Sequence, residues 1–372
     1  MHRLPRYSLE SWDEIRWQGE RAAWSKLLEN SRADPLFMSF EWQWHWWNYF
    51  GKSLAAQLQL FALRDAQGAL AGIAPLYRVR ARRRGLEVES VQLIGNSFRD
   101  RSTVISECLD FIVPSQDGDE CADTLVNHLQ ADLQWNEFVA VWVREDSALA
   151  AALGRNPLRA YLRNQDAATG YSIDLRAGFP AWLAQLSASA RRRLFNMRTR
   201  LERRGAVQLR TAGLDELPDM LGQIDRFHAR RWGGALFSGA ARAFHLDVAR
   251  DLAARGALHV SVLEVGGRGV SVFYDYRLGG RQYNLQMGFD DGFDAGLSPG
   301  LLHLGYVLER CAAGGVGSYE LLVGEGRRTN YKARYASERF QVTTLQGLRG
   351  GSALLGRGYD AAARLRRGLR RA

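Results

Sequence analysis

Residues 281–315, RQYNLQMGFDDGFDAGLSPGLLHLGYVLERCAAGG, decide the fold of this chain. The run 281–289 has the composition of a strand, and the apolar run from about 299 to 313 predicts a helix. Glycines and other small residues occupy the loop between them, Ser298 fits a helix N-cap, and Pro299 fits the first helical turn. The sequence therefore predicts a strand that enters a helix through a glycine-rich loop.

A helix start of this kind is suited to binding anions. Its first N–H groups have no partner inside the helix, and the helix dipole places partial positive charge beside them, so a pyrophosphate fits there. The simpler interpretation is that Ser-Pro-Gly only starts a helix, which is the commoner role of such a motif by itself.

The next segment, residues 319–337 (YELLVGEGRRTNYKARYAS), adds a family resemblance. A strand, a Ser-Pro-Gly helix start and a second strand that ends in glycine before a Tyr-Lys pair resemble the C-terminal region of CelD-like acetyltransferases. These are relatives of the FemAB-type proteins, which have two GNAT-like lobes. Residues 35–51 (PLFMSFEWQWHWWNYFG) and 190–205 (ARRRLFNMRTRLERRG) resemble the family's aromatic N-terminal segment and basic central helix, so the resemblance spans residues 35–348.

The resemblance implies an α/β (α+β) fold of two GNAT-like lobes, each a mixed central sheet flanked by helices. A degenerate lobe would span residues 1–170, an acyl-CoA-binding lobe residues 171–348, and a basic amphipathic tail residues 349–372. A length of 372 residues also fits two domains of ordinary size.

The implied co-substrate is acetyl-CoA or another acyl-CoA, held by the strand at 282–289 and by the amides of residues 298–301. The candidate binding residues are Met287, Gly288, Phe289, Gly296, Ser298, Pro299, Gly300 and Leu301. The loop departs from the general GNAT pattern, Arg/Gln-x-x-Gly-x-Gly/Ala, because it ends in Gly-Leu-Ser-Pro-Gly. The stretch 324–331 is also longer than the family pattern.

Direct acyl transfer requires a base for the acceptor's proton, donors for the developing oxyanion and an acid for the departing thiolate. Tyr331 and Lys332 are candidates for the last two roles. Lys332 stands out because only three of the 50 basic residues are lysines. A surface charge is the alternative interpretation of Lys332.

Four further residues are candidates for the base or for contacts with the acceptor: Glu320, Glu325, His228 and Asp290. Carboxylates and imidazole can be tuned toward a neutral pKa in a closed cleft. The simpler interpretations are a loop turn for Asp290, a solvated strand position for Glu320 and a helix end for His228.

Candidates for binding the acceptor are Arg193, Arg231, Trp232 and Tyr274. Arg193 belongs to a basic helix predicted over residues 183–204, whose apolar stripe leaves many arginines to face an anionic ligand. A solvated helix face is the commoner outcome for such a segment.

Hydrophobic periodicity predicts the remaining elements. Helical segments are expected at 11–30, 40–50, 117–133 and 215–255. Strands are expected at 55–65, 69–80, 86–95, 100–106, 138–145, 171–175, 258–265, 269–278, 318–324 and 340–346.

Composition narrows the class of partner and compartment. A formal net charge of +10, carried mainly by arginine, permits CoA, a phosphorylated glycan precursor, RNA or an acidic membrane as the anionic partner.

The three widely spaced cysteines form neither a disulfide framework nor a metal motif, so no metal is expected. Without a signal-peptide pattern or a membrane-spanning run, a cytoplasmic location is expected. The arginine-rich tail permits peripheral contact with an anionic inner membrane, whereas a mobile, solubilising tail is the simpler alternative.

The resemblance to CelD-like acetyltransferases thus implies an acyl-CoA-dependent N- or O-acyltransferase acting on an amine or sugar, a small molecule or a glycan, in polysaccharide or cell-envelope biosynthesis. The alternatives are a FemAB-like aminoacyl transferase that uses charged tRNA and a non-catalytic GNAT-like scaffold. The metalloprotease, P-loop, Rossmann and hydrolase motifs do not occur.

Overall fold

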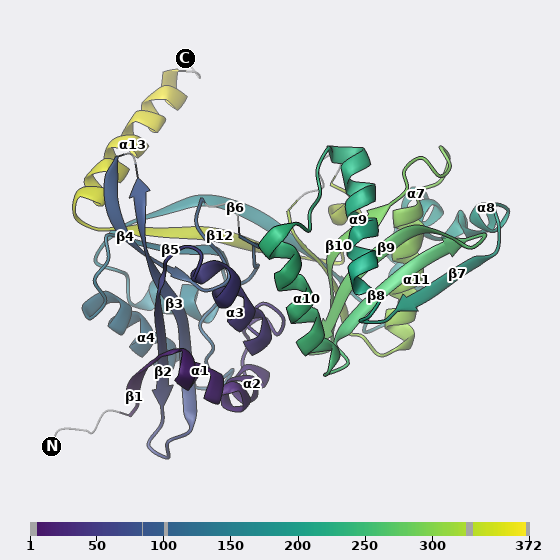
Figure 1. Cartoon of the computed structure of the whole chain (residues 1–372). Coiled ribbons are helices and arrows are strands. Elements are labelled where there is room, and N and C mark those ends of the chain that lie inside the picture. The colour runs from purple at the N-terminus through teal and green to yellow at the C-terminus, as the bar shows by residue number, and fades with distance from the viewer. Residues whose placement is uncertain (1–5, 84, 100–102, 325–329, 370–372) are drawn as a thin grey trace. The chain divides into compact units, whose positions relative to one another are not determined.

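The computed structural model describes residues 6–83, 85–99, 103–324 and 330–369, with the helical residues from 362 onward as backbone only. The chain forms two compact units, which Figure 1 shows with their elements labelled. The first unit comprises Met1–Ala168 and Gln341–Ala372, and the second comprises Thr169–Phe340. The strands β6 and β12 each carry the chain from one unit to the other.

The first unit is built on a mixed sheet. Its strands, in their order across the sheet, are β1 (Ser8–Trp12), β2 (Gln57–Arg64), β3 (Leu70–Arg83), β4 (Leu86–Leu93), β5 (Glu137–Arg144) and β12 (Glu338–Leu348). Neighbours are antiparallel except β4 and β5, which are parallel. Its helices are α1 (Glu14–Gly19), α2 (Arg21–Glu29), α3 (Phe40–Trp46), the π-helix η1 (Trp47–Gly51), α4 (Asp119–Ala131), α5 (Ala148–Arg155) and α13 (Gly350–Leu369).

The strands of the second unit are also mixed in direction. The strands follow the order β6 (Tyr161–Asp174), β11 (Ser318–Val323), β10 (Arg281–Phe289), β9 (Arg268–Leu278), β8 (Leu258–Val265) and β7 (Val207–Ala212). Only the pair β10 and β11 is parallel. The helices are α6 (Phe179–Gln185), α7 (Ala188–Arg191), the π-helix η2 (Arg192–Asn196), α8 (Arg198–Glu202), α9 (Leu217–Trp232), α10 (Gly239–Ala253), α11 (Pro299–Ala313) and α12 (Tyr331–Tyr335).

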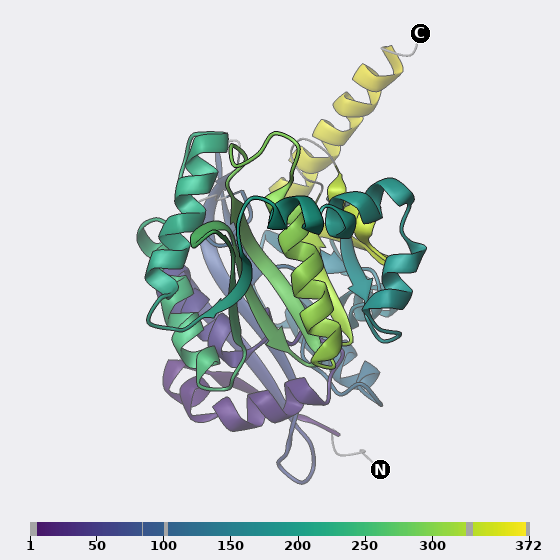
Figure 2. The ribbon, with the colours of Figure 1, turned by 90° about the vertical axis from the view of Figure 1, so that its right-hand side faces the viewer.

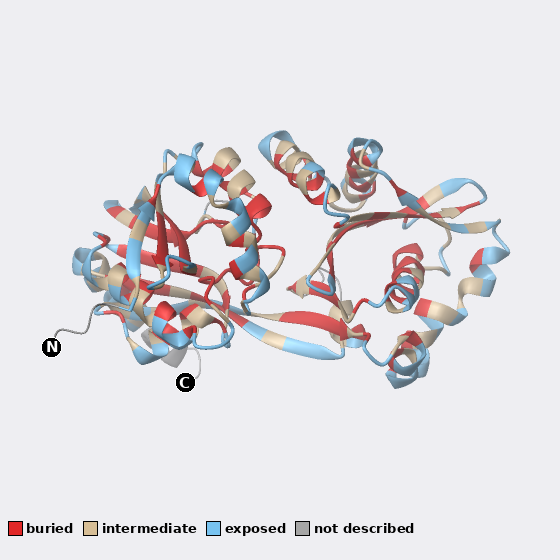
Figure 3. Cartoon of the chain, turned by 90° about the horizontal axis from the view of Figure 1, so that it is seen from below, coloured by how far each residue is buried: buried red, intermediate tan, exposed pale blue. Residues whose placement is uncertain are grey.

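Helices cover both faces of the second unit's sheet. The helix α11 packs against β9 and β10 on one face, and α9 packs against the same strands on the other (Figures 2 and 3). Buried side chains therefore lie on both sides of β9: Phe273 joins the core under α11, and Tyr274 faces His245 of α10. The predicted fold class, a mixed sheet flanked by helices, is confirmed.

The division of the chain differs from the expected boundaries near the C-terminus. Residues 341–348 belong to the first unit, because β12 pairs with β5 in antiparallel fashion from Val342 to Leu348. The segment 349–372 begins with α13, in the place of the expected basic tail, and belongs to the same unit.

Several elements differ from the sequence prediction. The expected N-terminal helix over residues 11–30 is preceded by the strand β1 and divides into α1 and α2, and the described part of the strand expected at 100–106 is not extended in a sheet. The basic helix expected over 183–204 is divided into α6, α7, η2 and α8. Ser187 starts a new helix by accepting a hydrogen bond from the Ala190 amide, and η2 then widens the turn.

Candidate active site

The strands β10 and β11 part from each other within the second unit. Their parallel pairing covers only Arg281–Tyr283 against Ser318–Glu320, although β10 continues to Phe289 and β11 to Val323. Each strand also carries a bulge, β10 relative to β9 after Asn284 and β11 relative to β6 after Glu320. Beyond the last paired residues, the facing backbone edges of the two strands do not pair with each other. We call this opening the fork.

A buried carboxylate lies at the vertex of the fork, which is the place where β10 and β11 stop pairing. Asp275 of β9 is 1% exposed and accepts hydrogen bonds from Gln282 Nε2 at 2.8 Å, from Asn284 Nδ2 at 2.7 Å and from the Tyr319 hydroxyl at 2.8 Å. Burial raises the pKa of Asp275 to about 6. Sequence reasoning missed this group, although a lone carboxylate within the apolar run VSVFYDYRL was a usable signal.

The helix α11 begins where the loop after β10 ends. It starts at Pro299, as predicted, and Ser298 occupies the N-cap position, but the Ser298 hydroxyl makes no capping hydrogen bond. The Leu301 amide donates to the Ser298 carbonyl at 3.1 Å, and proline has no N–H. Within the described residues, the amides of Ser298 and Gly300 therefore remain to face an anion, fewer than the sequence suggested.

Two of the predicted glycines allow close packing within the second unit. A Cβ at Gly300 would lie 2.6 Å from Phe289 Cδ1, and a Cβ at Gly288 would lie 2.8 Å from the Cα of Ile224 on α9. Gly288 thus brings β10 close beneath α9, and Gly300 brings the start of α11 close to the Phe289 ring.

Arginines surround the loop between β10 and α11. Asp290 forms an ion pair with Arg268, and Asp294 pairs with Arg200 and Arg204 at 2.9 and 2.6 Å. The Gly296 amide, at 2.7 Å, and the two arginines hold the pKa of Asp294 below its usual range. The loop also contains Asp291, so its three carboxylates balance the charge of these three arginines.

These pairings change two sequence interpretations. Asp290 is 5% exposed and engaged by Arg268 and by the Gly292 amide, so it is not a free general base. Gly296 gives its N–H to Asp294, and a Cβ there would lie 2.4 Å from the Arg200 guanidinium, so it packs against an arginine.

The C-terminal end of α9 brings predicted residues beside the loop. The Arg231 guanidinium lies 5.1 Å from the centre of the Trp232 ring and 4.8 Å from that of Phe289. Its Nε atom is buried and has no hydrogen-bond partner among the described residues. The sequence-predicted Arg231, Trp232, Phe289 and Gly300 are thus assembled in one place.

His228 lies one turn before Trp232 on α9, with ring centres 6.5 Å apart. Its Nδ1 lies 2.8 Å from the Gly234 carbonyl oxygen. Because a carbonyl can only accept, Nδ1 carries the proton in the neutral ring and Nε2 has a free lone pair. The helix ends at Trp232, and the left-handed conformation of the following residue Gly233, φ 81°, turns the chain back toward His228.

Tyr331 and Lys332 form the first turn of α12. Tyr331 packs against the core cluster that also receives Met287 and Leu301, and burial raises its pKa well above the usual value. The Nζ atom of Lys332 donates to the carbonyl oxygens of Leu322 and Val323, at 3.2 and 3.0 Å, at the end of β11.

The other predicted residues have varied positions. Glu320 is 8% exposed on β11 and accepts a hydrogen bond from the Ser318 hydroxyl at 2.7 Å, so it is not a solvated strand residue. Glu325 lies outside the described residues. Arg193 is exposed on η2. Tyr274 is fully buried and bonds the Tyr276 hydroxyl at 2.6 Å, so the prediction that it contacts an acceptor is wrong.

The described residues contain no cluster of three or more His, Cys, Asp or Glu side chains that could hold a metal ion. None of the helices in this part of the chain has both the length and the apolar character needed to cross a bilayer.

The fork lies within a segment of the chain that matches a family of known proteins. Residues 188–333 match the family described as "Acetyltransferase (GNAT) domain". No curated protein matches the chain in sequence. Among solved structures, FemX is similar over 92% of this chain and 97% of its own, at 8% identity and a TM-score of 0.59.

Two further structures share the fold. A conserved protein of unknown function from Bacteroides thetaiotaomicron is 11% identical, with a TM-score of 0.57 over 92% of this chain and 100% of its own. The C-terminal domain of a putative lysylphosphatidylglycerol synthetase from Agrobacterium fabrum is 11% identical, with a TM-score of 0.52 over 91% of this chain and 94% of its own. At these identities the likeness concerns the fold.

Proposed function

We propose that this acyltransferase takes its acyl group from acyl-CoA, with acetyl-CoA as the first candidate, and binds it in the fork of the second unit. The observation that supports this most is the parting of β10 and β11 directly before a helix start, within the residues that match an acetyltransferase domain. The fork leaves backbone edges that can hydrogen-bond the amides of an extended pantetheine arm.

The helix start supplies a place for the pyrophosphate. The amides of Ser298 and Gly300 lie at the positive end of α11, and Arg200, Arg204 and Arg268 surround the loop. The Arg231 guanidinium is a further donor, since its buried Nε atom has no partner among the described residues. These groups suit a polyanion such as CoA.

The transfer can then proceed directly. The His228 Nε2 takes the proton of the attacking amine or hydroxyl as the acceptor atom bonds to the thioester carbonyl carbon. The tetrahedral intermediate collapses, the carbon–sulfur bond breaks, and Tyr331 donates its proton to the thiolate. Tyr331 is protonated at neutral pH, because burial raises its pKa above the usual value, and the proton is therefore present for this step.

The acceptor remains an amine or sugar hydroxyl of a small molecule or glycan in polysaccharide or envelope synthesis, as the resemblance to CelD-like acetyltransferases suggests. A screen that measures free CoA thiol with a disulfide reagent would identify it, because each transfer releases one thiol. The screen should include amino sugars and their hydroxyl analogues, so that N- and O-transfer are separated.

Calorimetric titration with acetyl-CoA and CoA tests the donor. Gly300→Asp should weaken binding by at least tenfold relative to Gly300→Ala, because both variants displace Phe289 but only the first adds a negative charge at the helix start. Equal affinities of the two variants would remove this loop from the site.

Titration with charged tRNA tests the alternative donor. If the protein binds no CoA but binds charged tRNA with a steep salt dependence, it is an aminoacyl transferase instead. If it binds neither donor, the non-catalytic scaffold is the remaining function.

A further inference from the structure

The first unit contains a polar recess that is separate from the fork. It lies at the ends of β3, β4 and β5, between β6, β12 and the first turns of α13, and is open to solvent. Arg83, Arg99 and Arg163 line it together with the apolar side chains of Leu86, Leu355 and Tyr359. Cationic and apolar groups therefore share one recess.

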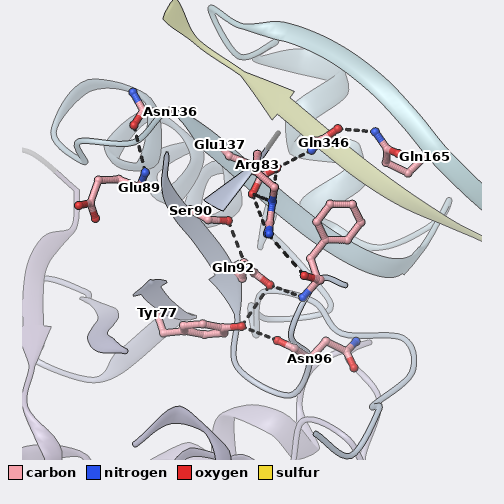
Figure 4. Close-up of polar contacts among 11 residues, drawn as sticks. Tyr77, Arg83, Glu89, Ser90, Gln92, Asn96, Asn136, Glu137, Gln165 and Gln346 are labelled. Atoms are coloured by element: carbon pink, nitrogen blue, oxygen red, sulfur yellow. Dashed lines mark hydrogen bonds and ion pairs between the residues drawn. The ribbon is translucent and has the colours of Figure 1, made fainter. Parts of the chain in front are cut away.

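The floor of the recess is a buried hydrogen-bond network, shown in Figure 4. Glu137 is 1% exposed and has both carboxylate oxygens engaged, one by Gln346 Nε2 at 2.6 Å and the other by Arg83 Nη2 at 3.2 Å. Gln346 in turn accepts a hydrogen bond from Gln165. The acid is thus satisfied by the protein, and Arg83 balances its charge, so that the pair is neutral beside an anion in the recess.

Two of the arginines keep donors available. Arg99 contacts the Phe98 ring at 4.9 Å and pairs with no carboxylate among the described residues. Arg163 pairs with Asp360 at 2.7 Å through one nitrogen, while its buried Nε atom has no hydrogen-bond partner in the described part of the chain. Arg99, which has no carboxylate partner in the described part of the chain, therefore gives the recess a cationic side chain that an anion can engage.

The wall on the α13 side is apolar and exposed. Leu355 is 43% exposed, Tyr359 46% and Leu86 43%, and Leu354 on the same helix is 72% exposed. The helix is fixed in this place by Gly356, where a Cβ would lie 2.5 Å from Leu348 Cδ1. Exposed leucines beside cationic side chains match a ligand with an anionic head and an apolar chain.

We propose that this recess binds the phosphate head group of an anionic phospholipid, with the lipid's acyl chains against Leu354, Leu355 and Tyr359. The sequence of α13 adds Arg357, Arg364, Arg366 and Arg367 to the same helix, which suits an anionic membrane surface. The lipid docks the first unit on the membrane, and this docking is independent of acyl-CoA binding in the second unit.

Co-sedimentation of the full chain with vesicles tests the proposal. Binding to mixed phosphatidylcholine and phosphatidylglycerol vesicles should exceed binding to pure phosphatidylcholine, and Arg99→Glu should reduce it about tenfold. The matched control is Arg159→Glu, an exposed arginine of the same unit outside the recess, which should change binding by less than about twofold. Equal losses in the two variants, or equal binding to both vesicles, would overturn the lipid site.

The apolar half of the site has its own control. Leu355→Ser should weaken vesicle binding, whereas Leu9→Ser, at a leucine of similar exposure on β1, should not. Titration with soluble glycerol phosphate distinguishes the two possible ligands, a lipid head group and a free phosphate ester. If glycerol phosphate binds as tightly as a short-chain phosphatidylglycerol, and Leu355→Ser leaves both unchanged, the recess is a site for free phosphate esters and the lipid proposal fails.

Discussion

Asp275 of β9 accepts a 2.8 Å hydrogen bond from the hydroxyl group of Tyr319 on β11, across the strand β10 that lies between them. The same carboxylate receives the side-chain amides of Gln282 and Asn284 from β10. One buried acid therefore joins three strands at the level where β10 and β11 stop pairing. This arrangement fixes the vertex of the fork.

The Asp275 carboxyl makes stability depend on pH. Its pKa is raised from 3.8 to about 6, so the folded state binds this proton more tightly than the unfolded state does. Its contribution is fully present below about pH 4 and is lost as the pH rises through about 6, a change of about 3 kcal/mol. Urea unfolding across this range should show that loss in the wild type and not in Asp275→Asn. Parallel profiles for the two proteins would contradict the prediction.

His303 of α11 should make stability change with pH in the opposite direction. Its ring is fully buried, lies 2.9 Å from the hydroxyl oxygens of both Ser261 and Ser271, and has a pKa lowered by burial to about 3. The unfolded state binds this proton better, so stability is present above about pH 6.5 and falls by about 1.4 kcal/mol per pH unit toward pH 3.

The comparison for His303 is the slope of unfolding free energy against pH. His303→Asn should have a shallower slope than the wild type below pH 6.5, although it will be less stable throughout. An unchanged slope in His303→Asn would show that the ring is not held neutral.

Local patterns in the sequence predicted much of the second unit. The helix α11 occupies the predicted residues 299–313, and the strands β8, β9 and β10 lie where alternation of apolar residues placed them. The departures have tertiary causes. The helix predicted over 183–204 is interrupted because Ser187 offers its hydroxyl as a cap and η2 adapts the turn to α11, where the Leu194 carbonyl lies against Gly305.

The site was only partly predictable, because partners distant in sequence set the chemistry of a side chain. Asp290 looked like a free acid, yet Arg268 on the neighbouring strand neutralises it. Tyr274 looked available for an acceptor. Successive residues of β9 face opposite sides of the sheet, however, and Tyr274 is on a side where it is buried in the core. Gly288 and Gly300 were recognised as important, but their close neighbours, Ile224 and Phe289, come from packing that local pattern does not encode.

The two glycines should respond differently to alanine. Gly288→Ala brings a Cβ to 2.8 Å from the Ile224 backbone, which cannot move alone, so we expect a loss of about 2 kcal/mol of stability. Gly300→Ala meets the edge of the Phe289 ring, a side chain that can move. Thermal unfolding should show that Phe289→Leu restores part of the stability lost in Gly300→Ala and none of that lost in Gly288→Ala. Rescue of both variants would contradict the assigned contacts.

Tyr331 should affect turnover and not donor binding. Removing a general acid slows transfer by about 100-fold, so Tyr331→Phe should lower kcat by that order while the Kd for acetyl-CoA stays unchanged. The ring is retained, so its packing on the core cluster is preserved. Tyr335→Phe, one turn later on α12, is the matched control and should retain wild-type kcat. A loss of CoA affinity in Tyr331→Phe would assign this residue to binding.

His228 should act as the base of the transfer. With Nδ1 hydrogen-bonded to the Gly234 carbonyl, the neutral ring presents Nε2 as the proton acceptor. His228→Asn should therefore lower kcat/KM by about 100-fold, because asparagine offers no base, while the Kd for acetyl-CoA stays unchanged. Asp290→Asn should affect kcat/KM much less, because Arg268 already holds that carboxylate in an ion pair. If His228→Asn keeps its activity and Glu320→Gln loses it, the base is Glu320, whose carboxylate lies on β11 at the last residue paired with β10.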